Sequence, residues 1–227
     1  MTVAWTSLLG ALAVAALFAQ QREPGAVKPD PAFAPVEDVP GLPRVLLVGD
    51  SISIGYTPFV RELLKGKVNV HRIPDNASAT INGLAHIGEW LSNGKWDLIH
   101  FNWGLHDLKI MEDGRRQVEE EVYARNLETL IERMRKTGAA LIFATTTPVP
   151  EGPVSPPRIS TDVIIYNNAA RGVMERSGVR INDLYAAVSP RLKELQLRIN
   201  VHYTPEGYRF LAEKVAAEIK AVLKIQD

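Results

Sequence analysis

The chain has 227 residues, of which 46% are hydrophobic and 23% charged, a composition typical of a globular domain and not of a disordered chain. Its 26 basic and 26 acidic residues cancel, so it lacks the positive charge that nucleic-acid binding requires, and we expect no nucleic-acid partner. The absence of cysteine excludes disulfides, thiolate metal sites and a cysteine nucleophile.

The first nineteen residues carry no charge, and residues 8–19 form an apolar run. This run has the length of the apolar part of a signal peptide and is shorter than the roughly 20 residues of a membrane span. We therefore expect residues 1–19 to be a signal peptide of an exported protein, periplasmic or secreted. The alternatives are an N-terminal anchor, which alone would bring the protein to a membrane, and a start codon placed too early.

Residues 20–43 contain six prolines and are expected to form an extended linker. From residue 44 to 227 the pattern alternates between short apolar runs and amphipathic stretches, which predicts one domain. Strands are expected at 44–49, 68–71, 97–101, 140–144 and 179–182, and helices at 57–65, 80–92, 115–136, 161–177 and 205–223. Such alternation predicts an α/β fold: a three-layer α/β/α sandwich around a five-stranded, doubly wound parallel sheet.

Polar residues stand where ligands bind in such sheets, beyond the carboxyl ends of the strands. Ser51 follows the first strand, residues 102–107 follow the third, and His202 precedes the last helix. A serine hydroxyl and an imidazole are the two halves of a nucleophile–base pair. Each residue taken singly is also compatible with a turn or a helix cap.

Three segments together carry a family resemblance: VLLVGDSIS at 45–53, NWGLHD at 102–107 and VHYTPEGY at 201–208. From about residue 44 to its end the chain resembles the SGNH (GDSL-type) hydrolases. The resemblance implies a flavodoxin-like fold and ester hydrolysis through an acyl-serine, without a metal or cofactor. It also implies that Ser51 is the nucleophile and His202 the general base.

The family's oxyanion hole uses the serine N–H, a backbone N–H after the second strand and a side-chain amide after the third. The resemblance assigns the first role to Ser51 and the second to Ser78, with Gly83 a more distant candidate. His106 stands where the family has its asparagine, and a neutral imidazole N–H can still donate. Asn102 is the alternative side-chain donor.

The family's acid lies three residues before the histidine, or in some sequences two, and those positions hold Ile199 and Asn200. The carbonyl oxygen of Asn200, or a backbone carbonyl, could hold the imidazole tautomer without supplying a charge. Asp183, at the end of the fifth strand, could supply the charge, although a helix cap or an ion pair is its ordinary role.

Three residues beside these motifs are candidate substrate contacts: Asp50, Trp103 and Gly104. Trp103 could stack on a sugar ring or pack in the core. The proline-rich segment 145–160 is expected to be either a wall of the substrate cleft or an exposed connector. His71, His86 and His100 lack a spaced ligand partner and are expected to be structural.

The sequence therefore predicts a serine esterase acting on a small-molecule or glycan ester, with O-acetyl groups on carbohydrate as the first substrate class. One alternative is a lipid or lysophospholipid esterase, which would need a wide apolar cleft beside Ser51. The other is a catalytically degenerate protein that binds glycans, which the missing acid favours.

Overall fold

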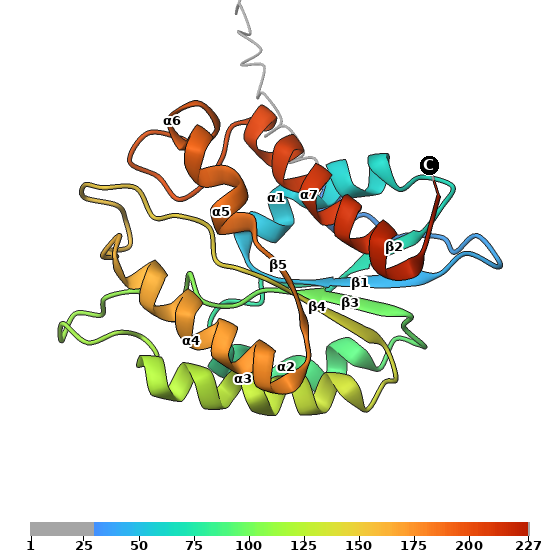
Figure 1. Cartoon of the computed structure of the whole chain (residues 1–227), viewed down its shortest axis with the longest axis horizontal. Coiled ribbons are helices and arrows are strands. Elements are labelled where there is room, and N and C mark those ends of the chain that lie inside the picture. Colours follow the sequence, from blue (N-terminus) through green and yellow to red (C-terminus); the bar gives the residue numbers. More distant parts are fainter. Residues whose placement is uncertain (1–29, 227) are drawn as a thin grey trace, which may run out of the picture.

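The structure is a computed structural model that describes residues 30–226. Its five strands are β1 (Arg44–Val48), β2 (Asn69–Arg72), β3 (Leu98–Phe101), β4 (Ala140–Ala144) and β5 (Arg180–Asn182). They form one parallel sheet in the order β2-β1-β3-β4-β5 (Figure 1). The predicted three-layer fold is confirmed, and each strand lies within one residue of its expected bounds.

Helices cover both faces of the sheet (Figure 1). One layer holds α1 (Ser51–Leu63), α7 (Pro205–Leu223) and the short helices α5 (Leu184–Val188), η2 (Ser189–Arg191) and α6 (Leu192–Leu195). The other holds α2 (Thr80–Leu91), α3 (Glu120–Arg135) and α4 (Asp162–Ser177). Because both faces are covered, the central strands are largely buried, and β3 is buried at every position.

Helix α1 begins at Ser51, six residues before its expected start at residue 57. Gly55 and Pro58 lower the helical propensity of this segment, which made it resemble a loop. The side chain of Asp50 caps the helix by accepting from the N–H of Ile52 at 2.9 Å. Packing supplies the rest, since a Cβ at Gly55 would lie 2.1 Å from the ring of Tyr208 on α7.

The contact at Gly55 leads to a stability prediction. Gly55→Ala should lower the free energy of unfolding by about 1–3 kcal/mol, because the added methyl would collide with the Tyr208 ring. Gly88→Ala on α2 is the matched control: nothing lies within 4 Å of its Cβ position, so alanine should stabilise by about 0.5–1 kcal/mol. Urea denaturation of the two variants measures both effects, and equal midpoints would contradict the close α1–α7 packing.

Residues 30–43 are packed against the domain, which differs from the extended linker expected for residues 20–43. Residues Pro31–Phe33 form a short 3₁₀ helix, η1, with Ala32 fully buried. The guanidinium of Arg61 on α1 donates to the carbonyl of Pro31 at 2.9 Å. The expected signal peptide, residues 1–19, and the first part of the expected linker lie outside the described residues.

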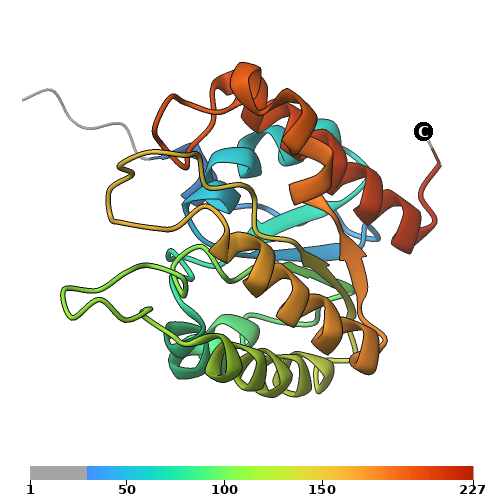
Figure 2. The same cartoon turned by 60° about the vertical axis from the view of Figure 1, so that its left-hand side comes forward.

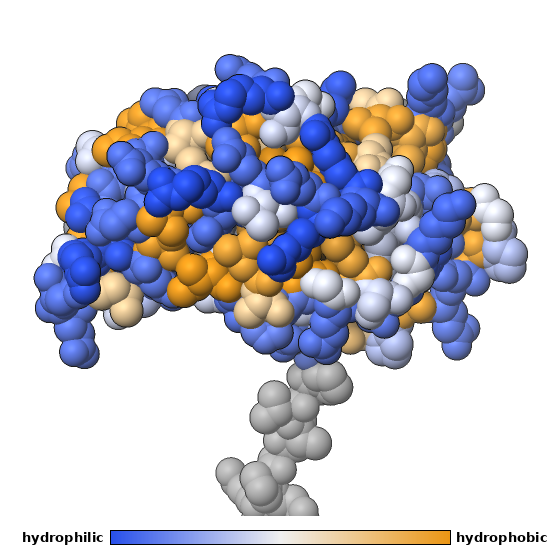
Figure 3. Space-filling view, turned by 90° about the horizontal axis from the view of Figure 1, so that it is seen from below, coloured by the Kyte–Doolittle hydropathy of each residue, from blue (hydrophilic) through white to orange (hydrophobic). Residues whose placement is uncertain are grey.

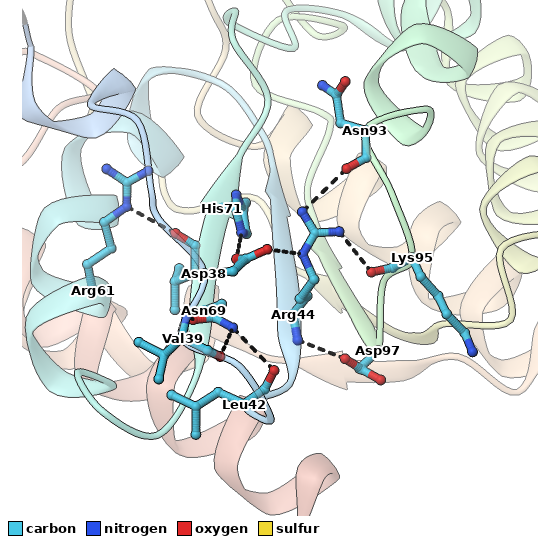
Figure 4. A network of polar contacts seen from close by, with 11 residues as sticks. Asp38, Val39, Leu42, Arg44, Arg61, Asn69, His71, Asn93, Lys95 and Asp97 are labelled. Atoms are coloured by element: carbon cyan, nitrogen blue, oxygen red, sulfur yellow. Dashed lines mark hydrogen bonds and ion pairs between the residues drawn. The ribbon is translucent and has the colours of Figure 1, made fainter.

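A polar network fixes this segment at the amino ends of β1 and β2 (Figure 4). The carboxylate of Asp38 pairs with Arg44 at 2.8 Å and with the imidazole of His71 at 2.6 Å. The amide of Asn69 donates to the carbonyls of Val39 and of Leu42. His71 is therefore a structural residue, whose side chain is held by Asp38.

The α2–α3–α4 face carries apolar side chains set between charged ones (Figure 3). Exposed residues on these helices include Ile81, Val122 and Ile165. Scattered apolar positions of this kind are ordinary for a soluble surface. Within residues 30–226, no helix combines the length and the apolar character that a bilayer crossing requires.

Candidate active site

The loops that follow β1, β3 and β4 meet the loop before α7 at the carboxyl edge of the sheet (Figure 2). In the sheet order, β2 lies to one side of β1 while β3, β4 and β5 lie to the other. The crevice between the ends of β1 and β3 is thus the topological switch point, where α/β sheets bind ligands.

Ser51 and His202 are in direct contact although 151 residues separate them. Ser51 is the first residue of α1, and its hydroxyl oxygen lies 2.9 Å from Nε2 of His202. This is hydrogen-bonding distance, the arrangement that a nucleophile and its base would need.

Asn200 completes a chain of three side chains. Its Oδ1 lies 2.7 Å from Nδ1 of His202 and 3.0 Å from the backbone N–H of the same residue. A backbone N–H can only donate, so the atom facing it must be the amide oxygen and not the NH₂ group. The same oxygen then requires a proton on Nδ1 of His202, which leaves Nε2 as the acceptor for the Ser51 hydroxyl. Asn200 thus imposes the tautomer that a general base needs, without a charge.

The other two acid candidates do not approach His202. Ile199 has a φ of 51° and turns its side chain towards Gly152, with Cγ2 and Cγ1 at 3.7 and 3.8 Å from that glycine's Cβ position. Asp183 caps α5 by accepting from Ala186 at 3.2 Å and pairs with Arg171. The structure does not support Asp183 as the source of the missing charge, because its oxygens accept from Thr145, Ala186 and Arg171.

The backbone N–H of Ser51 lies at the N-terminus of α1, where unpaired N–H groups and the helix dipole favour a negative charge. Asp50 was expected to contact substrate, but it is only 2% exposed and serves as the helix cap. Close approach also explains Gly49, since a Cβ there would lie 2.6 Å from that of Ser53.

Ser78 occupies the turn that leads into α2, with a φ of 53°, a conformation that favours glycine. It therefore stands where the resemblance expects a glycine. Its N–H, however, donates to Oδ1 of Asn76 at 2.9 Å, so it can serve an oxyanion only when that side chain moves away. The more distant candidate, Gly83, lies within α2 and makes room for Trp103, whose ring would be 2.6 Å from a Cβ at that position.

Asn102 is not an available oxyanion donor. Its NH₂ group donates to the carbonyl of Ala144 at 2.8 Å and approaches the hydroxyl of Thr146 at 3.4 Å. Both hydrogens are thus directed at the end of β4, and the side chain ties β3 to β4. The sequence-based alternative to His106 is wrong for this reason.

His106 lies beside Ser78 and Lys109. Its Nδ1 is 2.8 Å from Nζ of Lys109 and 3.2 Å from the hydroxyl of Ser78. Burial lowers the pKa of His106 to about 4; Lys109, Arg158 and His202 add to the effect, and Asp50 opposes it. The ring is therefore neutral at neutral pH, as an N–H donor in the asparagine's place should be.

Trp103 and Gly104 do not form a substrate surface. Trp103 is fully buried and its indole N–H donates to the carbonyl of Ala77 at 3.3 Å, so of the two roles considered it packs in the core and does not stack on a sugar. Gly104 is buried as well, with a φ of 143° and only 2.2 Å between its Cβ position and the hydroxyl of Thr146. Both residues position the turn that carries His106.

Asp107 is a helix cap, the ordinary role considered for it, but it caps a helix that lies far away in the sequence. It is fully buried, and its Oδ1 accepts from the N–H of Thr80 at 2.8 Å and from the Thr80 hydroxyl at 2.5 Å. It therefore caps α2, whose own N-cap residue, Ala79, has no side-chain acceptor. The sequence shows Asp107 as a polar residue after a strand, but it does not reveal that its partner is Thr80, 27 residues away.

The second oxygen of Asp107 is buried without a hydrogen-bond partner in the described part of the chain. Burial raises the pKa of Asp107 from 3.8 to about 6, against the opposing hydrogen bonds from Thr80. A raised pKa contributes stability that is complete below the unfolded-state pKa and is lost as the pH rises through about 6.

We therefore expect wild type to lose stability relative to Asp107→Asn as the pH rises from 5 to 7.5. The relative loss should be on the order of 1 kcal/mol, since one pKa unit corresponds to about 1.4 kcal/mol. Urea unfolding of both proteins at the two pH values measures it. A difference that stays constant, or that changes with the opposite sign, contradicts the raised pKa.

The proline-rich segment 145–160 forms one wall of a groove of about 930 Å³. The facing wall comes from α5, η2, α6 and the residues that lead to Asn200. Its apolar lining includes Pro148, Val149, Ile164, Leu192, Leu197 and Ile199. The segment is thus the wall of a groove and not a free connector, although neither Ser51 nor His202 is among the residues that line this groove.

The remaining histidines have structural surroundings. His100 is fully buried, and burial lowers its pKa to about 3, so it is neutral in the core. His86 lies 2.9 Å from the carbonyl of Asn82 and stacks on Trp90. Among residues 30–226, no group of three or more His, Cys, Asp or Glu side chains is arranged to hold a metal ion.

Comparison with known proteins places these motifs in a family. Residues 47–210, which span the Ser51 turn, the His106 turn and the His202 loop, match the GDSL-like lipase/acylhydrolase family. The chain belongs to this family. No curated protein matches the chain.

Solved structures of GDSL-like and related hydrolases share the fold. The lipase/acylhydrolase from Enterococcus faecalis has a TM-score of 0.69 and 22% identity, over 80% of this chain and 97% of that one. An SGNH hydrolase from Slackia heliotrinireducens has a TM-score of 0.60 and 21% identity, over 78% and 99%. Axe2, an acetylxylan esterase from Geobacillus stearothermophilus, has a TM-score of 0.64 and 18% identity, over 78% and 94%. The GDSL-like chain is therefore similar in architecture to enzymes that hydrolyse esters.

Proposed function

We propose that this GDSL-like hydrolase is a serine esterase with Ser51 as nucleophile, His202 as general base and Asn200 as the residue that orients it. The observation that carries the proposal is the continuous contact from the Ser51 hydroxyl through both ring nitrogens of His202 to the Asn200 oxygen.

The mechanism follows from these contacts. Nε2 of His202 takes the hydroxyl proton as Oγ of Ser51 bonds to the ester carbonyl carbon, and the carbonyl oxygen becomes the oxyanion. The N–H of Ser51 and the side chain of His106 are the donors for that oxyanion. His202 then gives its proton to the leaving alcohol, and a water molecule repeats the sequence on the acyl-serine to release the acid.

For the substrate, we propose O-acetyl groups on carbohydrate. The support is the shared fold with Axe2 and with a second acetyl xylan esterase, which covers 78% of the chain at a TM-score of 0.66. At 18% and 17% identity this likeness is a fold-level argument. We also propose, from residues 1–19, that the protein is exported.

A second candidate is a lipid or lysophospholipid esterase, and the apolar groove favours it. The groove ends at Ile199, next to Asn200, and Ile199 is 42% exposed there. A cavity of this size and lining suits an acyl chain better than a sugar ring. Relative kcat/KM on acetylated xylo-oligosaccharides and on long-chain esters distinguishes the two candidates.

Covalent labelling tests the nucleophile. A fluorophosphonate probe should label the wild-type chain at Ser51, identified by peptide mass spectrometry. Label found on another residue, or full labelling of Ser51→Ala, would overturn the assignment. If the protein hydrolyses esters but Ser51 is not labelled, it is an esterase that does not use Ser51 as its nucleophile.

Asn200→Asp tests the missing charge. The variant keeps an oxygen facing Nδ1 and adds the charge that stabilises the imidazolium, so kcat for a short nitrophenyl ester should rise. Because Asn200 already holds the correct tautomer, the gain should be on the order of tenfold, well below the roughly 10⁴ seen when an asparagine imposes the wrong one.

Ile199→Asp is the matched control for this charge. It places the carboxylate at the family's usual position, but the Ile199 side chain faces Gly152 and not His202. We expect its gain to be much smaller than that of Asn200→Asp. A fall in kcat with Asn200→Asp, or a larger gain at position 199, would refute the role of Asn200.

A further inference from the structure

His106 poses a problem that an asparagine does not. An amide NH₂ always donates, whereas a neutral imidazole carries its single N–H on either Nδ1 or Nε2. Only one of these nitrogens can face an oxyanion, so a histidine works as a donor only if its tautomer is held. The neighbours of Nδ1 decide which tautomer forms.

Lys109 is the closest of these neighbours, with Nζ 2.8 Å from Nδ1 of His106. An ammonium group has three donors and no acceptor, so the nitrogen that it faces must carry a lone pair. The proton of the neutral ring is then on Nε2. In the described part of the chain no group accepts a hydrogen bond from Nε2, which leaves that N–H available for a ligand.

The backbone around Lys109 keeps its ammonium in this position. Residues 104–109 form a helical turn closed by the N–H of Leu108 on the carbonyl of Gly104 at 3.0 Å. The carbonyl of Lys109 accepts from Gln117 at 2.8 Å, and the next N–H, of Ile110, donates to Pro157 at 2.9 Å. No carboxylate among residues 30–226 forms an ion pair with Lys109; Asp50 and Asp107 attract its ammonium without contacting it, whereas the ring nitrogen is in direct contact.

The charges around the ring also keep it from taking a second proton. Lys109, Arg158 and His202 are the cationic or titratable groups that act against protonation, and Asp50 is the group that favours it. Arg158 comes from the proline-rich segment and is held by the carbonyl of Leu105 at 2.8 Å. Burial remains the main cause of the lowered pKa of His106, and the charges of Lys109 and Arg158 act in the same direction against the opposing effect of Asp50.

We propose that Lys109 is a positioning residue that holds His106 as the Nε2–H tautomer, so that an imidazole can replace the amide donor of the oxyanion hole. The inference rests on the proposed esterase function of the same site. In this proposal Lys109 affects the substrate only through the imidazole of His106.

The direct test is the tautomer of His106 in the full chain, measured by nitrogen-15 NMR with labelled histidine at pH 7. The chain has five histidines, and His106→Asn identifies the signal. Wild type should show an unprotonated Nδ1 and a protonated Nε2. Lys109→Met, of similar length but without a donor, should shift the ring towards the Nδ1–H form, with Ser78 as acceptor. Lys109→Arg should restore the wild-type signal.

Ser78→Ala is the matched control, because it removes the other neighbour of Nδ1, at 3.2 Å, and leaves Lys109 in place. The Nε2–H tautomer should persist in this variant. A wild-type ring that carries its proton on Nδ1, or a tautomer that follows Ser78 and not Lys109, would overturn the proposal.

Kinetics supply the functional half of the test. Lys109→Met should lower kcat about tenfold with little change in KM, less than the loss from removing a whole oxyanion donor. In the His106→Asn background, where the amide needs no tautomer control, the same substitution should cause a much smaller loss. An equal loss in both backgrounds would show that Lys109 does not act through the ring.

The two proposals fail in different ways. If fluorophosphonate does not label Ser51, the esterase proposal fails, and the NMR result still decides whether Lys109 sets the tautomer. If Ser51 is labelled and the tautomer is independent of Lys109, only the positioning role fails.

Discussion

Ser51→Ala is expected to lower kcat for a short nitrophenyl ester by about 10⁵-fold, the largest effect of any single substitution in this chain. The hydroxyl is the atom that bonds to the ester carbon, and no other hydroxyl lies within hydrogen-bonding distance of Nε2 of His202 in the described residues. The residual rate should come from binding and the oxyanion donors alone.

Two further variants show whether Ser51 and His202 act as one unit. His202→Ala should cause a loss of similar size, and the double variant should lose little more than either single one. Ser53→Ala is the control: it removes a serine hydroxyl from the same helix, at a buried position two residues along. It should retain near wild-type kcat. Independent, multiplying losses for Ser51 and His202 would contradict the contact between them.

The strands were predictable because their signal is local. The central strands are runs of apolar residues buried on both faces, so composition alone locates them, as at residues 98–101. The pairing of Ser51 with His202 was also predictable, because the expected fold brings the end of β1 and the loop before α7 to the carboxyl edge of the sheet. The start of α1 was not predictable, because the reason for a glycine at position 55 inside the helix is the ring of Tyr208, which is distant in the sequence.

The site errors share a physical cause, which is that a donor's availability depends on distant acceptors. The sequence offers Asn102 as an oxyanion donor, but its amide donates to the carbonyl of Ala144, 42 residues away. Trp103 resembled a sugar platform, but Gly83 opens a space in α2 that buries it. The amide orientation of Asn200 depends on the backbone of His202, which no residue pattern reveals.

His106→Ala is expected to reduce kcat by about 10²–10³-fold, the usual consequence of removing one oxyanion donor. The loss in kcat should lie towards the upper end of this range, because few other donors are available. The amide of Asn102 donates to Ala144 at the end of β4, and the N–H of Ser78 donates to Asn76. KM should change little, since the donor binds the oxyanion more strongly than it binds the ground-state carbonyl.

His106→Asn is the informative companion to this loss. Asparagine is the residue that the resemblance places at this position, and its amide can donate without any tautomer control. It should recover most of the activity that alanine loses, provided that the shorter side chain reaches the oxyanion. Steady-state kinetics of the three proteins on one ester measure this order.

Asn76→Ala completes the account of the oxyanion hole, since it frees the N–H of Ser78 to act as a third donor. In the His106→Ala background, Asn76→Ala should therefore raise kcat, because the remaining donors are few and each one counts for more. If Asn76→Ala has no effect there, the turn at Ser78 does not face the oxyanion. If His106→Ala retains full activity, the imidazole is not a donor, and the oxyanion is then stabilised by the N-terminus of α1.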